Sequence, residues 1–370
     1  MKTKGALLWE PGTRSGWSIE EIELDPPKKR EALIRLAASG LCHSDDHLDT
    51  GDMQIPFAPL LGGHEGAGVV EQVGPGVTEV SPGDHVALAF IPACGTCIPC
   101  VSGRQNLCDV GAGVLEGKAP DGTHRIHARG KGVGAMSFLG TFSPYCVAPI
   151  DAVIKIDPAI PLDVAALVGC GVPTGWGSAV YAAETRIGDT VVVAGVGGVG
   201  MNAVQGARFA GGKNVIAIDP VQYKLDQALQ FGATHTFDDP VKAKEVLIDL
   251  TRGQLADKVI CTVGEMDNEV IKAAVDMTGK AGTVVITGVG YYDMVLPGGI
   301  LIGYHRRMQG ALFGGANPLY DIPMILGLWQ SGDVKLNELV TKRYTLGQVN
   351  EGYQDMMDGK NIRGVLIHEH

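Results

Sequence analysis

The segment Val191-Val192-Val193-Ala194-Gly195-Val196-Gly197-Gly198-Val199-Gly200 joins an apolar strand to a G-x-G-x-x-G turn, and the helix-like stretch Met201 to Ala210 follows it. In this motif Gly195 permits the tight turn, Gly197 lets a pyrophosphate approach the backbone, and Gly200 lets the helix pack on the strand. Gly198 and Val199 complete the loop, and the N-terminus of the helix faces the anion. The order of strand, glycine loop and helix predicts a dinucleotide-binding unit.

A second strand, Val215 to Ile218, ends in Asp219 at about the distance expected for the residue that holds the ribose. Its carboxylate can accept both ribose hydroxyls and would repel a 2′-phosphate, which favours NAD over NADP. A plain glycine loop without a ligand is the alternative. Lys224 is a candidate for contact with the adenosine ribose, and a solvated helix lysine is the competing interpretation.

The rest of the chain predicts an α/β protein with two different halves. Further apolar strands, Lys258 to Cys261 and Thr283 to Thr287, alternate with helical stretches, which indicates a doubly wound parallel sheet. The first 150 residues instead have short β-type runs between glycine- and proline-rich turns, typical of an antiparallel barrel: Ala32 to Ala37, Ala67 to Val73 and His85 to Phe90. The tail has helical periodicity from Ile322 to Trp329. It ends in a strand, Gly364 to His368, without a partner nearby in sequence, so we expect this strand to return to the first half.

The amino-acid composition and net charge restrict the kinds of molecule that the chain is expected to bind. A chain of 370 residues with 45% hydrophobic and 19% charged residues is expected to form two ordinary globular domains. The net charge of −11 and the pI near 5.4 argue against binding to nucleic acid or an anionic membrane. The chain shows neither a secretory leader nor a long apolar segment, and we expect a cytoplasmic protein.

Four cysteines are spaced C-x2-C-x2-C-x7-C, at Cys94, Cys97, Cys100 and Cys108. Four thiolates this close in sequence can surround one tetrahedral zinc ion with no open position, which is the form of a structural site. A pair of disulfides is the alternative, and the tight spacing disfavours it.

A second group of metal ligands is predicted from residues that lie far apart in sequence. Cys42 precedes His43 and Ser44, His64 precedes Glu65 in Gly62-Gly63-His64-Glu65-Gly66, and Cys170 lies between two glycines. Two thiolates and one imidazole leave the fourth position of a zinc ion open, as a catalytic site requires. Taken singly, His64 could be a satisfied polar residue and Cys170 a small buried hydrophobe.

With these motifs in this order, the chain resembles a zinc-dependent alcohol dehydrogenase of the medium-chain dehydrogenase/reductase superfamily from Lys4 to Ile367. The resemblance implies a GroES-like β-barrel catalytic domain at 1–172 with the structural-zinc lobe, a Rossmann NAD-binding domain at 173–314, and a C-terminal segment at 315–370 that returns to the catalytic domain. It implies two zinc ions per subunit, one catalytic and one structural.

The resemblance also implies residue roles. Cys42, His64 and Cys170 would bind the catalytic zinc, with Glu65 as a distant fourth ligand and Asp45 orienting His64. Ser44 would take the alcohol proton, and His47 would pass it to solvent. The cofactor would contact Thr174, Val289 and Arg363, the last as a clamp on the pyrophosphate. His43 stands where many relatives have an arginine that binds the pyrophosphate, and a histidine loses its charge near neutral pH.

The implied activity is oxidation of primary alcohols to aldehydes by hydride transfer to NAD. A zinc-dependent reductase of aldehydes or enones with the same fold is the alternative, and a non-catalytic binding protein is a remote one. The segments Met1 to Pro27 and Asp109 to Phe142 are most similar to bacterial nicotinoprotein alcohol dehydrogenases, assayed with dimethyl-nitrosoaniline, whose NAD(H) stays bound. Such an enzyme needs an external redox acceptor. Relatives pair their subunits, and a homodimer or tetramer is expected.

Overall fold

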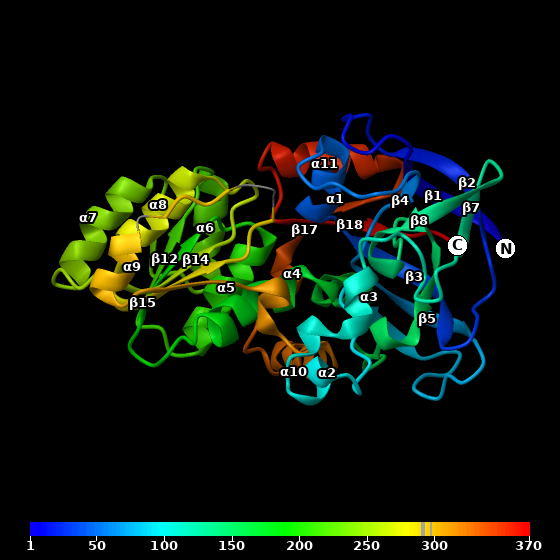
Figure 1. Cartoon of the computed structure of the whole chain (residues 1–370), viewed down its shortest axis with the longest axis horizontal. Helices are drawn as coiled ribbons and strands as arrows, with labels where there is room; N and C mark the ends of the chain where they lie inside the picture. The colour runs from blue at the N-terminus through cyan, green and yellow to red at the C-terminus, as the bar shows by residue number, and fades with distance from the viewer. Residues whose placement is uncertain (290–292, 297) are drawn as a thin grey trace. The chain divides into compact units, whose positions relative to one another are not determined.

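The computed structural model describes residues 1–289, 293–296 and 298–370 and divides the chain into two compact units (Figure 1). The first unit contains Met1–Cys170 and Asn317–His370, and the second contains Gly171–Ala316. The boundaries predicted from the sequence are 172/173 and 314/315.

A small closed barrel lies in the first unit. Its strand order is β1 (Lys2–Leu8), β2 (Ser18–Leu24), β7 (Ile126–Ala128), β8 (Lys131–Ala135) and β4 (Leu60–Leu61). Neighbouring strands are antiparallel except β4 and β8, which are parallel. On β2 the buried Ile22 and Leu24 alternate with exposed glutamates, the period expected when one face of a strand lines a core. These two side chains join Leu7, Leu61 and Ile126 in the apolar interior.

The first unit also contains a seven-stranded sheet. Its order is β10 (Val153–Lys155), β6 (His85–Leu88), β5 (Gly66–Val73), β3 (Glu31–Gly40), β18 (Arg363–Ile367) and β17 (Val340–Tyr344), and β9 (Tyr145–Pro149) also pairs with β3. The return of the C-terminal strand is confirmed, because β18 pairs antiparallel with β3. The expectation that it lacks a partner nearby in sequence was wrong, because β17 pairs with it in parallel. Only the two ends of β17 are buried, so its sequence shows little strand periodicity.

Five α-helices belong to the first unit: α1 (His43–Thr50), α2 (Ile98–Val101), α3 (Leu162–Ala165), α10 (Pro318–Ser331) and α11 (Val349–Met357). Helix α1 begins directly after β3, has Asp45 and Asp46 in its first turn where they favour the helix dipole, and ends at Gly51 with φ of 89°. Its buried Leu48 packs in an apolar cluster with Trp17 and Tyr353. This packing fixes the face of α1 that carries polar residues.

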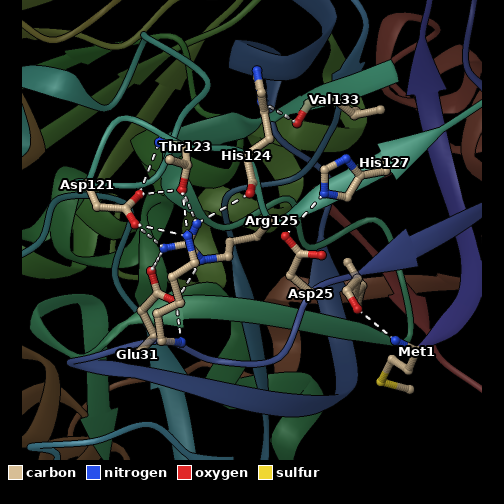
Figure 2. Close-up of polar contacts among 11 residues, drawn as sticks. Met1, Asp25, Glu31, Asp121, Thr123, His124, Arg125, His127 and Val133 are labelled. Carbon is tan, nitrogen blue, oxygen red and sulfur yellow. Dashed lines mark hydrogen bonds and ion pairs between the residues drawn. The ribbon is translucent and has the colours of Figure 1, made fainter. Parts of the chain in front are cut away.

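A buried ion pair connects the start of β3 to the loop before β7. The guanidinium of Arg125 donates from Nε to Glu31 Oε2 at 2.8 Å and from Nη2 to Glu31 Oε1 at 2.6 Å, and Nη2 also contacts Asp121 (Figure 2). Glu31 and Arg125 are both buried. This two-point geometry holds the loop against the sheet.

The second unit is built on a six-stranded parallel sheet. Its strand order is β13 (His235–Phe237), β12 (Asn214–Ile218), β11 (Thr190–Ala194), β14 (Ala256–Cys261), β15 (Thr278–Ile286) and β16 (Arg307–Gly310). The helices are α4 (Gly171–Gly177), α5 (Gly198–Phe209), α6 (Gln222–Gln230), α7 (Pro240–Leu250), α8 (Asn268–Met277) and α9 (Gly298–Tyr304). The predicted strands after Thr190 are all present, so the prediction of a parallel sheet is confirmed.

Both faces of this sheet are covered, as a parallel sheet requires. Val192 and Val259 lie in one apolar cluster with side chains from α7 and α8. Their neighbours in sequence, Val191, Val193 and Ile260, are also fully buried, although strand geometry directs them to the opposite face. The sheet is therefore doubly wound, and Figure 1 shows its strands among the surrounding helices.

Among the described residues no single helix has the length and apolar composition of a membrane span. The helical stretches Leu162–Gly169 and Gly171–Ala182 meet these criteria only when they are taken together as a bent pair.

Candidate active site

Four buried side chains that are far apart in sequence converge in the first unit. The possible ligand atoms of Cys42, His64, Glu65 and Cys170 all lie within 4.8 Å of one another. Cys42 precedes α1, His64 and Glu65 precede β5, and Cys170 follows a 3-10 turn at Ala166–Gly169. Zinc holds sulfur at about 2.3 Å and nitrogen at about 2.0–2.1 Å, so this cluster has the size and the donors of one zinc coordination sphere.

Asp45 fixes the orientation of His64. Its Oδ2 lies 2.9 Å from His64 Nδ1, and its Oδ1 accepts a 2.8 Å hydrogen bond from the backbone N–H of Gly63. Both Asp45 and His64 are buried. Since Nδ1 faces the carboxylate, Nε2 is the ring nitrogen that remains to bind a metal.

The ionisation of the cluster matches a cation site. The hydrogen bond between the two thiols lowers the pKa of Cys42 well below its usual range and raises the pKa of Cys170 well above it. Burial alone would lower the pKa of His64, but the charges of Asp45 and Cys42 outweigh it and raise this pKa well above its usual value. The Cys42 thiolate and the neighbouring carboxylate of Asp45 thus make the site electronegative, and a divalent cation bound there would neutralise this charge.

Glu65 pairs with Arg363 at the back of the cluster. The Arg363 Nη2 group contacts Glu65 Oε2, and both side chains are buried. Burial lowers the pKa of Arg363, but the charge of Glu65 outweighs it, so the guanidinium stays charged. Gly40 makes room for the pair, because a Cβ there would lie 2.0 Å from Glu65 Oε2. The buried Nε of Arg363 has no hydrogen bond to the described residues. Its predicted contact with pyrophosphate stays a prediction.

Ser44 and His47 lie three residues apart on α1 and therefore on one side of that helix. Ser44 Oγ lies 3.7 Å from Cys42 Sγ, next to the predicted zinc ligands. His47 is buried, and its ring centroid lies 5.7 Å from that of His43. The polar side of α1 thus carries the residues predicted to move a proton.

The four-cysteine lobe forms a separate site in the same unit. The sulfur atoms of Cys94, Cys97, Cys100 and Cys108 lie within 4.8 Å of one another, and none of these cysteines forms a disulfide. The backbone N–H of Cys97 points to Cys94 Sγ at 3.4 Å, and that of Cys94 points to Cys108 Sγ at 3.3 Å. The backbone N–H of Thr96 is the main cause that lowers the pKa of Cys94 to about 6. Backbone donors to sulfur stabilise thiolates, which fits a closed zinc site.

The glycine loop in the second unit has the local geometry of a phosphate cradle. Gly195 has φ of 84°, and a Cβ on Gly200 would lie 1.9 Å from the carbonyl oxygen of Gly195, so neither position accommodates a side chain. A Cβ on Gly197 would meet no described atom within 4 Å. Gly197 also precedes α5 without a side-chain cap, which leaves the first N–H groups of the helix for an anion.

Asp219 lies at the carboxyl end of β12, beside this loop. Its Oδ2 accepts a hydrogen bond from the Val196 N–H and its Oδ1 accepts one from the Val221 N–H, both at 3.0 Å. Each oxygen retains a second acceptor site for a ribose hydroxyl. The buried carboxylate therefore fits a ribose and disfavours a 2′-phosphate.

The remaining predicted cofactor residues of the second unit have less defined surroundings. Thr174 lies on α4, and its buried hydroxyl has no hydrogen bond to the described residues, as expected where a polar ligand binds. Gly198 and Val199 form the first turn of α5. Lys224 is half-buried on α6. Val289 follows β15 and is 43% exposed.

Two residues near the metal cluster were missed by the sequence analysis. Asp52 Oδ2 lies 3.5 Å from His47 Nδ1. Thr141 donates from Oγ1 to the backbone carbonyl of Glu65 at 2.9 Å. Asp52 is only five residues from His47, so a turn after the helix could bring the two side chains together. No local sequence pattern indicates the contact between Thr141 and Glu65, which are 76 positions apart.

Two family models match the chain. The model described as "Alcohol dehydrogenase GroES-like domain" matches residues 28–158, and the model described as "Zinc-binding dehydrogenase" matches residues 198–328. The first range contains three of the four converging ligands and the four-cysteine lobe. The second begins at Gly198, within the glycine loop, and contains strands β12 to β16 of the parallel sheet.

Full-length relatives are similar over the entire chain. An NDMA-dependent alcohol dehydrogenase from Amycolatopsis methanolica is 54% identical over 371 residues, covering 100% of this chain and 99% of the relative. Alcohol dehydrogenase B from Mycobacterium tuberculosis is 51% identical over 370 residues, covering 99% of this chain and 98% of the relative.

Solved structures share the fold. An alcohol dehydrogenase zinc-binding domain protein from Burkholderia ambifaria superposes with a TM-score of 0.92 at 30% identity, and each chain is covered completely. A benzyl alcohol dehydrogenase from Acinetobacter calcoaceticus superposes with a TM-score of 0.90 at 26% identity, again with complete coverage of both chains.

Proposed function

Since this chain belongs to the zinc-dependent alcohol dehydrogenases of the medium-chain dehydrogenase/reductase superfamily, we propose that it oxidises primary alcohols to aldehydes with an NAD(H) that stays bound between turnovers. Membership of the family makes it a zinc-containing oxidoreductase that oxidises alcohols with NAD. The choice of primary alcohols and the retention of the cofactor are the parts that we propose.

The convergence of Cys42, His64, Glu65 and Cys170 is the observation that carries the chemistry. Cys42, His64 Nε2 and Cys170 would hold the catalytic zinc. Glu65 would be a distant fourth ligand, because its carboxylate is paired with Arg363. Zinc in such a site lowers the pKa of a hydroxyl group and NAD accepts a hydride, so the protein itself has to supply position and a path for one proton.

We assign removal of the alcohol proton to two residues of α1. We assign Ser44 as the group that accepts the alcohol proton, because its hydroxyl lies 3.7 Å from a predicted zinc ligand. His47 lies one helical turn further on and is the base that would receive this proton through the cofactor ribose and pass it to solvent. The partly buried aromatic ring of Phe90, in edge contact with His64 at 5.7 Å between centroids, helps to exclude water from the site.

Retention of NAD(H) is supported by the relative from Amycolatopsis methanolica, which is named for its dependence on NDMA and matches the full length of this chain. An enzyme of this kind reduces an external acceptor and needs no added NAD. The test is to purify the protein without cofactor and to assay it with primary alcohols and dimethyl-nitrosoaniline. We expect turnover without added NAD, and nicotinamide detectable in the protein by its near-ultraviolet absorbance and by native mass spectrometry.

A protein that carries no nicotinamide as purified and works only with added NAD would contradict the proposed retention. Initial rates in both directions separate alcohol oxidation from the alternative, reduction of aldehydes or enones. The same native mass spectra report the subunit number, for which we propose a homodimer or tetramer.

A further inference from the structure

One ring nitrogen of His47 forms no hydrogen bond within the described part of the chain, but a carboxylate lies close to it. Its Nδ1 is buried, and the carboxylate oxygen Oδ2 of Asp52 lies 3.5 Å from it. The two side chains differ in exposure, with 5% for His47 and 49% for Asp52. The carboxylate of Asp52 therefore lies between the buried ring of His47 and solvent.

The turn after α1 places this carboxylate. The backbone N–H groups of Gly51 and Met53 both donate to the carbonyl oxygen of His47 at 3.0 Å, which folds residues 51–53 back over the end of the helix. Thr50 Oγ1 donates to Asp52 Oδ2 at 2.6 Å. This hydrogen bond is the main cause that lowers the pKa of Asp52, and His47 lowers it further, so the carboxylate is charged near neutral pH.

We propose that Asp52 is a positioning residue for proton release: its carboxylate keeps the proton of neutral His47 on Nδ1, so that Nε2 is free to accept the proton that Ser44 takes from the alcohol. The inference rests on the proposed function of the site. It extends that function by a residue that acts through His47.

The proton balance is simple. Neutral His47 gains one proton at Nε2 and becomes an imidazolium, whose charge the nearby carboxylate stabilises. The imidazolium then loses one proton to bulk water, which reaches the half-exposed Asp52, and proton exchange with solvent restores the Nδ1–H tautomer that the carboxylate favours. No electron moves in this step, and the histidine returns to its neutral form for the next alcohol.

Other charged groups surround the pair, and they provide a matched control. Asp46 interacts electrostatically with His47 itself, and Arg14 interacts with the carboxylates of both Asp46 and Asp52. The ring of His43 lies beside His47. Asp46→Asn removes one carboxylate from the same helix, while the carboxylate at 3.5 Å from Nδ1 stays in place. Asp52→Asn removes that carboxylate instead.

The kinetic test follows a single reduction of bound NAD by alcohol, so that release or reoxidation of the cofactor does not mask the step. We expect Asp52→Asn to slow this reaction about tenfold or more, within the range for residues that orient a functional group. The solvent isotope effect should rise, because proton transfer then limits the rate. Asp46→Asn removes a charge near His47 but not the carboxylate beside Nδ1, so it should slow the reaction less than Asp52→Asn does. Asp52→Glu should recover part of the rate.

A double variant separates positioning from general damage to the fold. If Asp52 acts through His47, His47→Gln with Asp52→Asn should be no slower than His47→Gln alone. If Asp52→Asn slows both backgrounds by the same factor, or if it leaves the rate and isotope effect of wild type unchanged, the proposal is wrong.

A spectroscopic measurement tests the same proposal without an activity assay. Nitrogen NMR of protein labelled at histidine, with His47 assigned by comparison with His47→Gln, reports which ring nitrogen carries the proton. We expect Nδ1–H in wild type and a shift toward Nε2–H in Asp52→Asn. If wild type shows Nε2–H, the proposal fails. If wild type shows Nδ1–H but no alcohol reduces its NAD, the proposed function fails and the His47–Asp52 contact stands.

Discussion

Asp45 contacts His64 at 2.9 Å between Oδ2 and Nδ1 and holds the preceding residue, Gly63, through its other oxygen at 2.8 Å. One carboxylate thus sets both the ring orientation and the backbone of a predicted zinc ligand. Gly63 has φ of 87°, and a Cβ there would lie 2.4 Å from Thr141 Oγ1, so the segment accepts no side chain at this position. The ligand is held from several sides before any metal binds.

Asp45→Asn is therefore expected to weaken zinc at the catalytic site. The amide can still accept a hydrogen bond but loses the charge that favours a basic Nε2, and the loss of such a partner lowers metal affinity about 10- to 100-fold. Competition with a zinc chelator measures the change. Zinc in the four-cysteine lobe should be unaffected and serves as the internal control. Equal chelation profiles for Asp45→Asn and wild type would exclude this role.

Thr141 supports the same segment from the other side. Its hydroxyl donates to the Glu65 carbonyl at 2.9 Å in a fully buried position, and the Gly40 N–H at 3.3 Å is a longer second donor. Thr141→Val should lower the free energy of unfolding by about 1–3 kcal/mol, because it leaves a buried acceptor poorly satisfied. Thr141→Ser keeps the hydroxyl and should recover most of this loss. Denaturant titration compares the two variants, and equal stability of both would contradict the assignment.

The buried pair of Glu31 and Arg125 predicts a larger effect. Glu31→Gln leaves the buried guanidinium with Asp121 as a remaining charged partner, so the loss of folding free energy should reach at most the cost of breaking a buried ion pair, about 3–5 kcal/mol. The exposed pair of Lys272 and Asp276 on α8 is a suitable contrast, and Asp276→Asn should change stability little. Thermal or denaturant unfolding of both variants tests the difference. Similar losses of unfolding free energy in the two variants would show that burial does not determine the strength of these ion pairs.

His368 predicts how stability depends on pH. Ser39 Oγ donates to the Thr141 carbonyl at 2.6 Å, so the 2.8 Å contact between Ser39 Oγ and His368 Nε2 requires the histidine to donate. Its buried Nδ1 is then unprotonated and has no hydrogen bond to the described residues. Burial is the main cause that lowers the pKa of His368 to about 4.

The unfolded chain binds a proton at this histidine below about pH 6.5, whereas the folded chain does not until about pH 4. The stability from neutral His368 is thus fully present above about pH 6.5 and is lost as pH falls toward 4, by about 3 kcal/mol at most. His368→Gln keeps a donor for Ser39 without titrating, so its unfolding free energy should fall less between pH 7 and 4. Parallel curves for the two proteins would count against the assignment.

Local patterns were enough to predict some parts of the structure. The apolar run Val191 to Ala194 lies within a strand as predicted, Thr190–Ala194, because a buried parallel strand followed by a glycine turn is specified within one short segment. The pairing of β18 with β17 was not predicted, because the exposed residues 341–343 show no alternation. Contacts such as Thr141 with Glu65 and Arg363 with Glu65 join residues 76 and 298 positions apart, and the fold rather than a motif brings them together.

The central claim is that zinc held by Cys42, His64 and Cys170 carries out alcohol oxidation, while zinc in the four-cysteine lobe supports the fold. Metal analysis of wild type, Cys42→Ser and Cys97→Ser, combined with an alcohol oxidation assay, tests it most directly. We predict two zinc ions per chain in wild type. Cys42→Ser should retain one zinc and a folded structure but lose activity, and Cys97→Ser should chiefly lose stability. One zinc per wild-type chain, located in the four-cysteine lobe, or near-normal turnover by Cys42→Ser would contradict the claim.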